Sequence, residues 1–177
     1  MIRWILIIVA VLVVLVLVLA IVGLLLPREH SASSRITLRQ PPEAVWLVIS
    51  DPEGVPSWWP EIARSERLPA SENGRPRVRQ TTRGGDAMIL EVEQSEPPTR
   101  LRTLVATGAG DPFGGTWTYQ LAPTDSGTTL TITEDGWVSN PIFRVIMQAM
   151  GTHRTLDSYL SALGRRFGES TSPAHLD

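Results

Sequence analysis

The chain begins with an apolar segment that is long enough to cross a lipid bilayer. From Trp4 to Leu26 every residue is apolar or glycine, and most are Ile, Val or Leu. As an α-helix rising about 1.5 Å per residue, this segment covers roughly 34 Å, whereas the hydrocarbon core of a bilayer is about 30 Å thick. The sequence therefore predicts a transmembrane anchor over residues 1–27, with the membrane contact made by residues 4–26.

A cleaved secretory signal is the main alternative for this segment. Signal sequences have an apolar region of about 7–15 residues and end at a site of small residues. Here the apolar run is longer, and Leu26 is followed by Pro27 and Arg28 without such a site. We therefore expect a retained, single-pass anchor in the cell membrane. Arg3 and the amino terminus nearly balance the arginines after the span, so the positive-inside rule favours a cytoplasmic domain by a narrow margin.

The composition excludes several kinds of site. The chain has no cysteine, which rules out disulfides, thiol nucleophiles and cysteine metal sites. A net charge of −2 gives no support for nucleic-acid binding. His30, His153 and His175 are far apart in the chain and predict no metal site. Phosphate loops, dinucleotide-binding glycine patterns and nucleophile elbows are also missing from the sequence, so we expect no cofactor.

The rest of the chain has the pattern of one α+β domain at residues 34–168, between a linker at 28–33 and a disordered tail at 169–177. Residues 34–40 alternate apolar and polar side chains and predict a strand, and two short helices are expected at 41–50 and 55–62. Alternation and turn residues predict six further strands, at residues 63–70, 76–83, 87–96, 100–108, 115–123 and 128–137.

After Asn140 the apolar period changes from two to 3.6, which predicts one long amphipathic helix that reaches Phe167. Strands in sequence followed by a helix are typical of the α+β class, with an antiparallel sheet packed on helices. We expect a strongly curved seven-stranded antiparallel sheet that surrounds the long C-terminal helix and leaves space between the two.

Four segments in this order resemble the SRPBCC or START-like superfamily, which includes polyketide cyclase/dehydrase, lipid-transport and birch-pollen-allergen-like proteins. The segments are RQPPEAVWLVISDPEGVPSWWPEI (39–62), SEPPTRLRTLV (95–105), FGGTWTYQLAPTDSGTTLTITEDGWVSNPIFR (113–144) and the closing helix. The resemblance covers residues 33–167. It implies a helix-grip fold with an internal apolar cavity for lipids, sterols, quinones or polyketides. It carries over no catalytic residue, because this superfamily has no universal catalytic motif.

Side chains expected to face the cavity are the candidate ligand-binding residues. Alternate positions of a strand share a face, and methionine and aromatic side chains suit an adaptable apolar pocket. Ordinary core packing is the alternative for each of them, and it is favoured for the aliphatic ones. The candidates are Trp58, Met88, Leu90, Trp117, Tyr119, Ile132, Phe143, Met147 and Met150.

Three hypotheses for the function follow. The first is a membrane-anchored, non-catalytic carrier or sensor of a hydrophobic small molecule such as a lipid, an isoprenoid or a quinone. The second is a cyclase- or dehydrase-like enzyme acting on a polyketide-type substrate, with Glu134 and His153 as acid and base. It requires both side chains to reach one cavity. The third is a protein-interaction domain whose interior is filled by its own side chains.

Overall fold

The computed structural model describes residues 2–108 and 111–176. The helices within these ranges are α1 (Ile2–Leu25), α2 (Pro42–Ile49), the 3₁₀ helix η1 (Val55–Ser57), α3 (Pro141–Met150) and α4 (Arg154–Arg166). The strands are β1 (Glu29–Leu38), β2 (Ile62–Leu68), β3 (Arg77–Thr82), β4 (Ala87–Glu96), β5 (Arg100–Val105), β6 (Phe113–Thr124), β7 (Gly127–Val138) and β8 (Ala174–His175).

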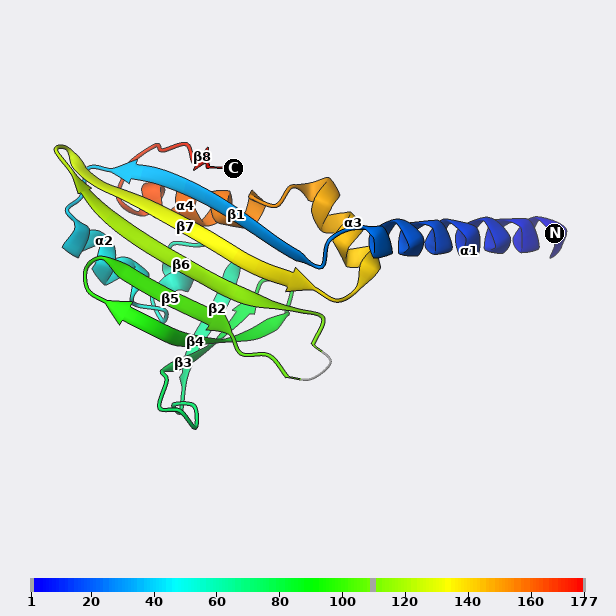
Figure 1. Ribbon diagram of the computed structural model, residues 1–177, viewed down its shortest axis with the longest axis horizontal. Coiled ribbons are helices and arrows are strands. Elements are labelled where there is room, and N and C mark those ends of the chain that lie inside the picture. The colour runs from blue at the N-terminus through cyan, green and yellow to red at the C-terminus, as the bar shows by residue number, and fades with distance from the viewer. Residues whose placement is uncertain (1, 109–110, 177) are drawn as a thin grey trace.

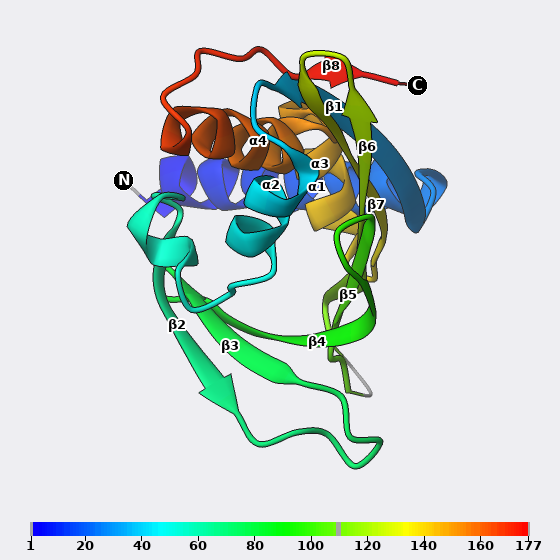
Figure 2. The same ribbon diagram turned by 90° about the vertical axis from the view of Figure 1, so that its left-hand side faces the viewer.

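The strands form one antiparallel sheet in the order β2-β3-β4-β5-β6-β7-β1-β8. Consecutive strands from β2 to β7 are neighbours, β1 lies beside β7, and the short β8 is an eighth strand beside β1, where seven strands were expected. The sheet curves strongly, and α2 and α4 lie on its concave side (Figure 2). The prediction of an α+β, helix-grip architecture is therefore confirmed.

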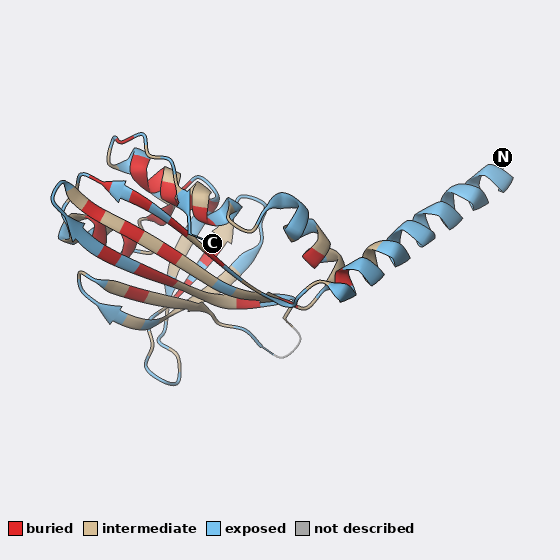
Figure 3. Cartoon of the chain, turned by 45° about the horizontal axis from the view of Figure 1, so that its top comes forward, coloured by how far each residue is buried: buried red, intermediate tan, exposed pale blue. Residues whose placement is uncertain are grey.

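The core lies where α4 packs on the concave face of β1 and β7 (Figure 3). Leu156, Leu160 and Leu163 form one stripe of α4 and are fully buried, as the i, i+4, i+7 spacing predicts. Their partners Leu130 and Ile132 on β7 are also fully buried. This contact fixes α4 against one half of the sheet, and β2 to β5 curve away from it.

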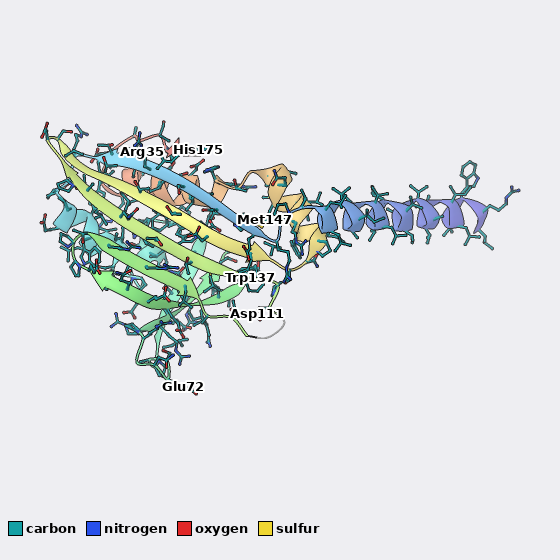
Figure 4. The ribbon with its side chains drawn as sticks, in the orientation of Figure 1. Arg35, Glu72, Asp111, Trp137, Met147 and His175 are labelled. Carbon is teal, nitrogen blue, oxygen red and sulfur yellow. The ribbon has the colours of Figure 1, made fainter. Side chains whose placement is uncertain are left out.

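The two ends of the domain differ from the expectation. The segment 28–33 is not a linker, because β1 begins at Glu29 and pairs with β7 along its whole length. The tail is not disordered: β8 pairs with β1 through Ala174 and His175, beside Arg35 (Figure 4). Glu169 is buried and accepts hydrogen bonds from the backbone N–H of Arg39. The sequence pattern of the tail is polar, so its order depends on such contacts with distant residues, which include a hydrogen bond from the backbone N–H of Leu176 to the backbone oxygen of Ser33.

The prediction of one long C-terminal helix is wrong. The helix stops at Gly151, whose φ of 86° and ψ of 134° are accessible chiefly to glycine, and α4 starts again at Arg154. Of these two C-terminal helices, only α4 packs on the concave side of the sheet. α3 lies instead beside the C-terminal end of α1, at the end of the domain (Figures 1 and 3).

By length and composition α1 is able to cross a membrane. It is the one such helix in the described ranges, and almost all of its apolar side chains are exposed in the isolated chain. An N-terminal signal sequence would have the same properties. The length and composition of α1 therefore fit either a membrane anchor or a signal sequence.

Candidate functional site

A cavity of about 750 Å³ lies between the curved sheet and α4. Its size falls in the range of about 300–1,000 Å³ that is usual for small-molecule sites. Strands β2 to β7 supply most of the wall, and further lining residues come from the segment between Ile49 and Trp59 and from Thr155 and Tyr159 of α4. Most of the lining side chains are apolar, including Ile62, Val78 and Leu101. The arrangement fits a hydrophobic small molecule.

Tyr159 is the centre of an aromatic cluster on the cavity wall. Its ring lies 5.0 Å from Trp58, 5.1 Å from Trp59, 5.6 Å from Trp117 and 5.8 Å from Tyr119, measured between centroids. All four contacts are edge-on, the geometry that the aromatic quadrupole favours. The cluster joins α4, the segment after η1 and strand β6 into one wall.

Two tyrosine hydroxyls provide polar groups inside this apolar wall. Burial raises the pKa of Tyr119 and of Tyr159 well above the ordinary tyrosine value, because the phenolate would be desolvated. Hydrogen bonds from Tyr159 and Thr103 oppose the shift at Tyr119 but do not cancel it. Both hydroxyls therefore stay neutral at physiological pH. They are able to exchange hydrogen bonds with a ligand's oxygen, but they are poor general bases.

Glu134 is the one acidic side chain of the cavity lining. Its Oε1 lies 3.5 Å from the Nε2 of His30 on β1, and its Oε2 is buried without a hydrogen-bond partner. Gly136 makes room for this pair, because a Cβ there would overlap the His30 ring. The cavity thus has a carboxylate at the β7 side of its wall, with an imidazole behind it.

Four of the predicted ligand-binding residues line the cavity. Met88 and Leu90 come from β4, and Trp117 and Tyr119 come from β6. Each pair shares a strand face, as the alternation predicts. Their role in binding a ligand stays a prediction.

The other five predicted residues do not line the cavity. Trp58 packs edge-on against Tyr159, and Trp59 lines the cavity in its place. Ile132 is fully buried in the core. Phe143, Met147 and Met150 lie on α3, beside the end of α1; Figure 4 shows Met147 there. The single-helix interpretation misplaced these three residues, because the chain turns at Gly151.

His153 does not accompany Glu134. It precedes the first turn of α4 and stacks on His175, with 3.9 Å between the ring centroids. It is not part of the cavity lining. The histidine beside Glu134 is His30, which was not among the residues expected in the cavity. The predicted acid–base pair of Glu134 and His153 is therefore not assembled.

Sequence analysis also missed Trp59 and Tyr159 as cavity residues. For Trp59 the available signal was its position next to Trp58, because two neighbouring residues of a short helix do not both face inward. For Tyr159 the signal was its place on the apolar stripe of α4, three residues after Leu156. Within residues 2–108 and 111–176, no group of three or more His, Asp or Glu side chains is arranged to hold a metal ion.

The fold and the cavity define a helix-grip domain with a mainly apolar internal cavity. The profile of the family "polyketide cyclase / dehydrase and lipid transport" matches residues 29–167. The chain belongs to this family. No curated protein matches it.

Solved structures share this fold at low sequence identity. A START superfamily protein from Mycobacterium smegmatis is 22% identical with a TM-score of 0.60, and the match covers 79% of this chain and 97% of that one. A conserved protein from Geobacillus kaustophilus is 21% identical with a TM-score of 0.64, covering 82% and 100%. The ZhuI aromatase/cyclase from Streptomyces sp. R1128 is 17% identical with a TM-score of 0.64, covering 78% and 93%. These similarities show the fold alone.

Proposed function

We propose that this protein is a membrane-anchored carrier or sensor that holds a hydrophobic small molecule, such as a lipid, an isoprenoid or a quinone, in its internal cavity. The observation that carries the proposal is the cavity itself, with about 750 Å³ of space and a mainly apolar lining. The family description, which includes lipid transport, agrees with it.

The anchor is the second part of the proposal. Hydrophobic ligands of this kind dissolve in membranes, and a tethered domain meets them there. Retention of α1 is favoured over cleavage because its end is built into the domain: the backbone oxygens of Gly23 and Leu26 accept hydrogen bonds from the buried Arg144. A cleaved signal would leave that guanidinium without two of its partners. The predicted cytoplasmic side of the domain rests on the arginine count alone.

A cyclase- or dehydrase-like reaction is the second candidate. The observation in its favour is Glu134, a carboxylate on the cavity wall with one unpartnered oxygen. His153 takes no part in this version, because it does not line the cavity. Any proton transfer by Glu134 would have to involve His30 or the ligand itself.

The carrier proposal is tested by mass spectrometry of molecules that remain bound to the full-length protein after extraction in mild detergent and washing. Leu90→Trp places an indole in the cavity, and Leu47→Trp, at a side chain 71% exposed on α2, is the matched control. The wild type and Leu47→Trp should carry one enriched hydrophobic molecule that Leu90→Trp loses. Identical extracts from all three proteins, with folding verified by circular dichroism, would contradict the proposal.

A further inference from the structure

α3 carries an apolar stripe that the described part of the chain does not cover. Phe143, Ile146 and Met150 recur at i, i+3 and i+7 and so share one face of the helix. Their exposed fractions are 55%, 44% and 51%. Arg144 is the one charged residue of α3, and its side chain is buried. A grouped apolar surface of this kind is typical of a contact with another molecule or with a membrane.

The opposite side of α3 holds the end of α1. The Arg144 guanidinium donates hydrogen bonds from Nη1 to the backbone oxygens of Gly23 (3.1 Å) and Leu26 (3.3 Å). Carbonyl groups at a helix C-terminus lack helical N–H partners and carry the negative end of the dipole, so a cation is favoured there. Arg144 also donates to the backbone oxygens of Val138 and Ser139, each at 2.8 Å. One side chain thereby joins α1, α3 and the end of β7.

The contact between α1 and α3 fixes the depth of α3. A Cβ at Gly23 would overlap the backbone carbonyl of Pro141, so the two helices touch at a glycine. Gly23 lies inside the apolar run, three residues before its end at Leu26, which is about 5 Å along a helix axis. If α1 spans a bilayer, α3 lies beside its last turn, at the boundary between headgroups and acyl chains.

We propose that α3 is an interfacial helix whose stripe of Phe143, Ile146 and Met150 inserts into the leaflet that contains the C-terminal end of α1. The inference rests on the anchoring part of the proposed function. Its occupant is lipid, because α3 packs against the end of the apolar helix α1 and its one charged side chain, Arg144, is buried against that end instead of lying on the stripe. Helices of this kind bury their apolar face about 5–10 Å into the interface.

This placement brings one rim of the cavity to the membrane. Phe113 lines the cavity, is 46% exposed and pairs with Val138, the last residue of β7. Asn140, two residues later, is the N-cap of α3. α3 contributes no residue to the cavity lining, so it does not cover this rim. A hydrophobic ligand then passes between leaflet and cavity beside Phe113 with little exposure to water.

The absence of native cysteine allows single-site labelling of the full-length protein. Single cysteines are introduced at Phe143, Ile146 or Met150, labelled with an environment-sensitive fluorophore, and reconstituted into phosphatidylcholine/phosphatidylglycerol vesicles containing brominated acyl chains. We expect strong quenching and a blue-shifted emission at all three. Gln148→Cys, on the opposite face of α3, and Ser126→Cys, in the exposed β6–β7 turn, should stay unquenched.

A labelled Leu24→Cys variant in α1 separates the two proposals. Quenching at Leu24, with α3 labels as unquenched as Ser126, would overturn the interfacial role of α3 and leave the anchor standing. An unquenched Leu24, or an intact mass that lacks α1, would show that the anchoring proposal itself is wrong. Equal quenching at Gln148 and Ile146 would overturn the one-sided insertion that the stripe implies.

Discussion

Truncation of Tyr159 tests whether the aromatic cluster holds the cavity wall together. Tyr159 is 3% exposed and makes edge-on contacts with four rings at centroid distances of 5.0–5.8 Å. Such pairs are each worth about 0.5–1.5 kcal/mol beyond their buried area. Replacement of a large buried aromatic residue by alanine typically costs about 3–5 kcal/mol. Four such pairs together give about 2–6 kcal/mol, which overlaps the range for alanine replacement, and we expect Tyr159→Ala to lower the free energy of unfolding by about 4 kcal/mol.

Tyr159→Phe is the matched control, because it keeps all four ring contacts and removes only the hydroxyl. The lost hydrogen bond to Tyr119 should cost about 0.5–1.5 kcal/mol. Urea unfolding of the full-length protein in detergent micelles, followed by far-UV circular dichroism, measures both variants. With a slope of about 2 kcal/mol per molar urea, the alanine variant should lower the midpoint by about 2 M.

Two results would refute this reasoning. An alanine variant within about 1 kcal/mol of the wild type would mean that the four ring contacts contribute little. A phenylalanine variant as unstable as the alanine variant would assign the stability to the hydroxyl pair instead of the rings. Either result would also weaken the description of the cluster as a rigid wall of the cavity.

Three further predictions concern stability and are measured by urea unfolding of the same preparation. Burial raises the pKa of Tyr119 and Tyr159 in the folded state, so their contribution to the free energy of unfolding is complete below the ordinary tyrosine pKa of about 10. Above that pH the contribution is lost by about 1.4 kcal/mol per pH unit for each tyrosine. Tyr119→Phe should make this fall in stability less steep, and equal slopes in the variant and the wild type would contradict the prediction. Gly151→Ala should lower the free energy of unfolding by about 1–3 kcal/mol, because alanine is strained at the positive φ of this position. A Cβ at residue 151 meets nothing within 4 Å, so steric overlap adds nothing to this cost. Gly84→Ala is the control, since Gly84 has no positive φ, and it should cost less. Glu169→Ala leaves the partly buried backbone N–H of Arg39 without its charged acceptor and should cost about 1–3 kcal/mol, with Glu169→Gln closer to the wild type. An alanine variant as stable as the wild type would show that the tail contact contributes nothing.

Local chemistry explains the parts of the fold that the sequence predicts correctly. The apolar run from Trp4, the alternation of β4 and β6, and the turn at Asn73-Gly74 are each encoded by a few neighbouring residues. The same alternation places Met88, Leu90, Trp117 and Tyr119 on one face of their strands, and the sheet turns that face toward the cavity. These positions were predictable because strand periodicity does not depend on the partners of a strand.

The remaining features depend on contacts between distant parts of the chain. Glu134 meets His30 instead of His153 because β1 and β7 pair in a register that a sequence pattern does not specify. The long amphipathic period after Asn140 looks continuous, and only the backbone conformation of Gly151 divides it.

The sequence by itself determined an apolar N-terminal helix, an α+β helix-grip domain and the faces of β4 and β6 that line its cavity. The tertiary structure alone decided where the apolar helix α3 lies. Arg144 is 121 residues from Gly23, and its hydrogen bonds turn α3 away from the sheet and toward α1. Periodicity reports which side chains avoid water, whereas the three-dimensional arrangement determines whether they meet a core, a ligand or a membrane.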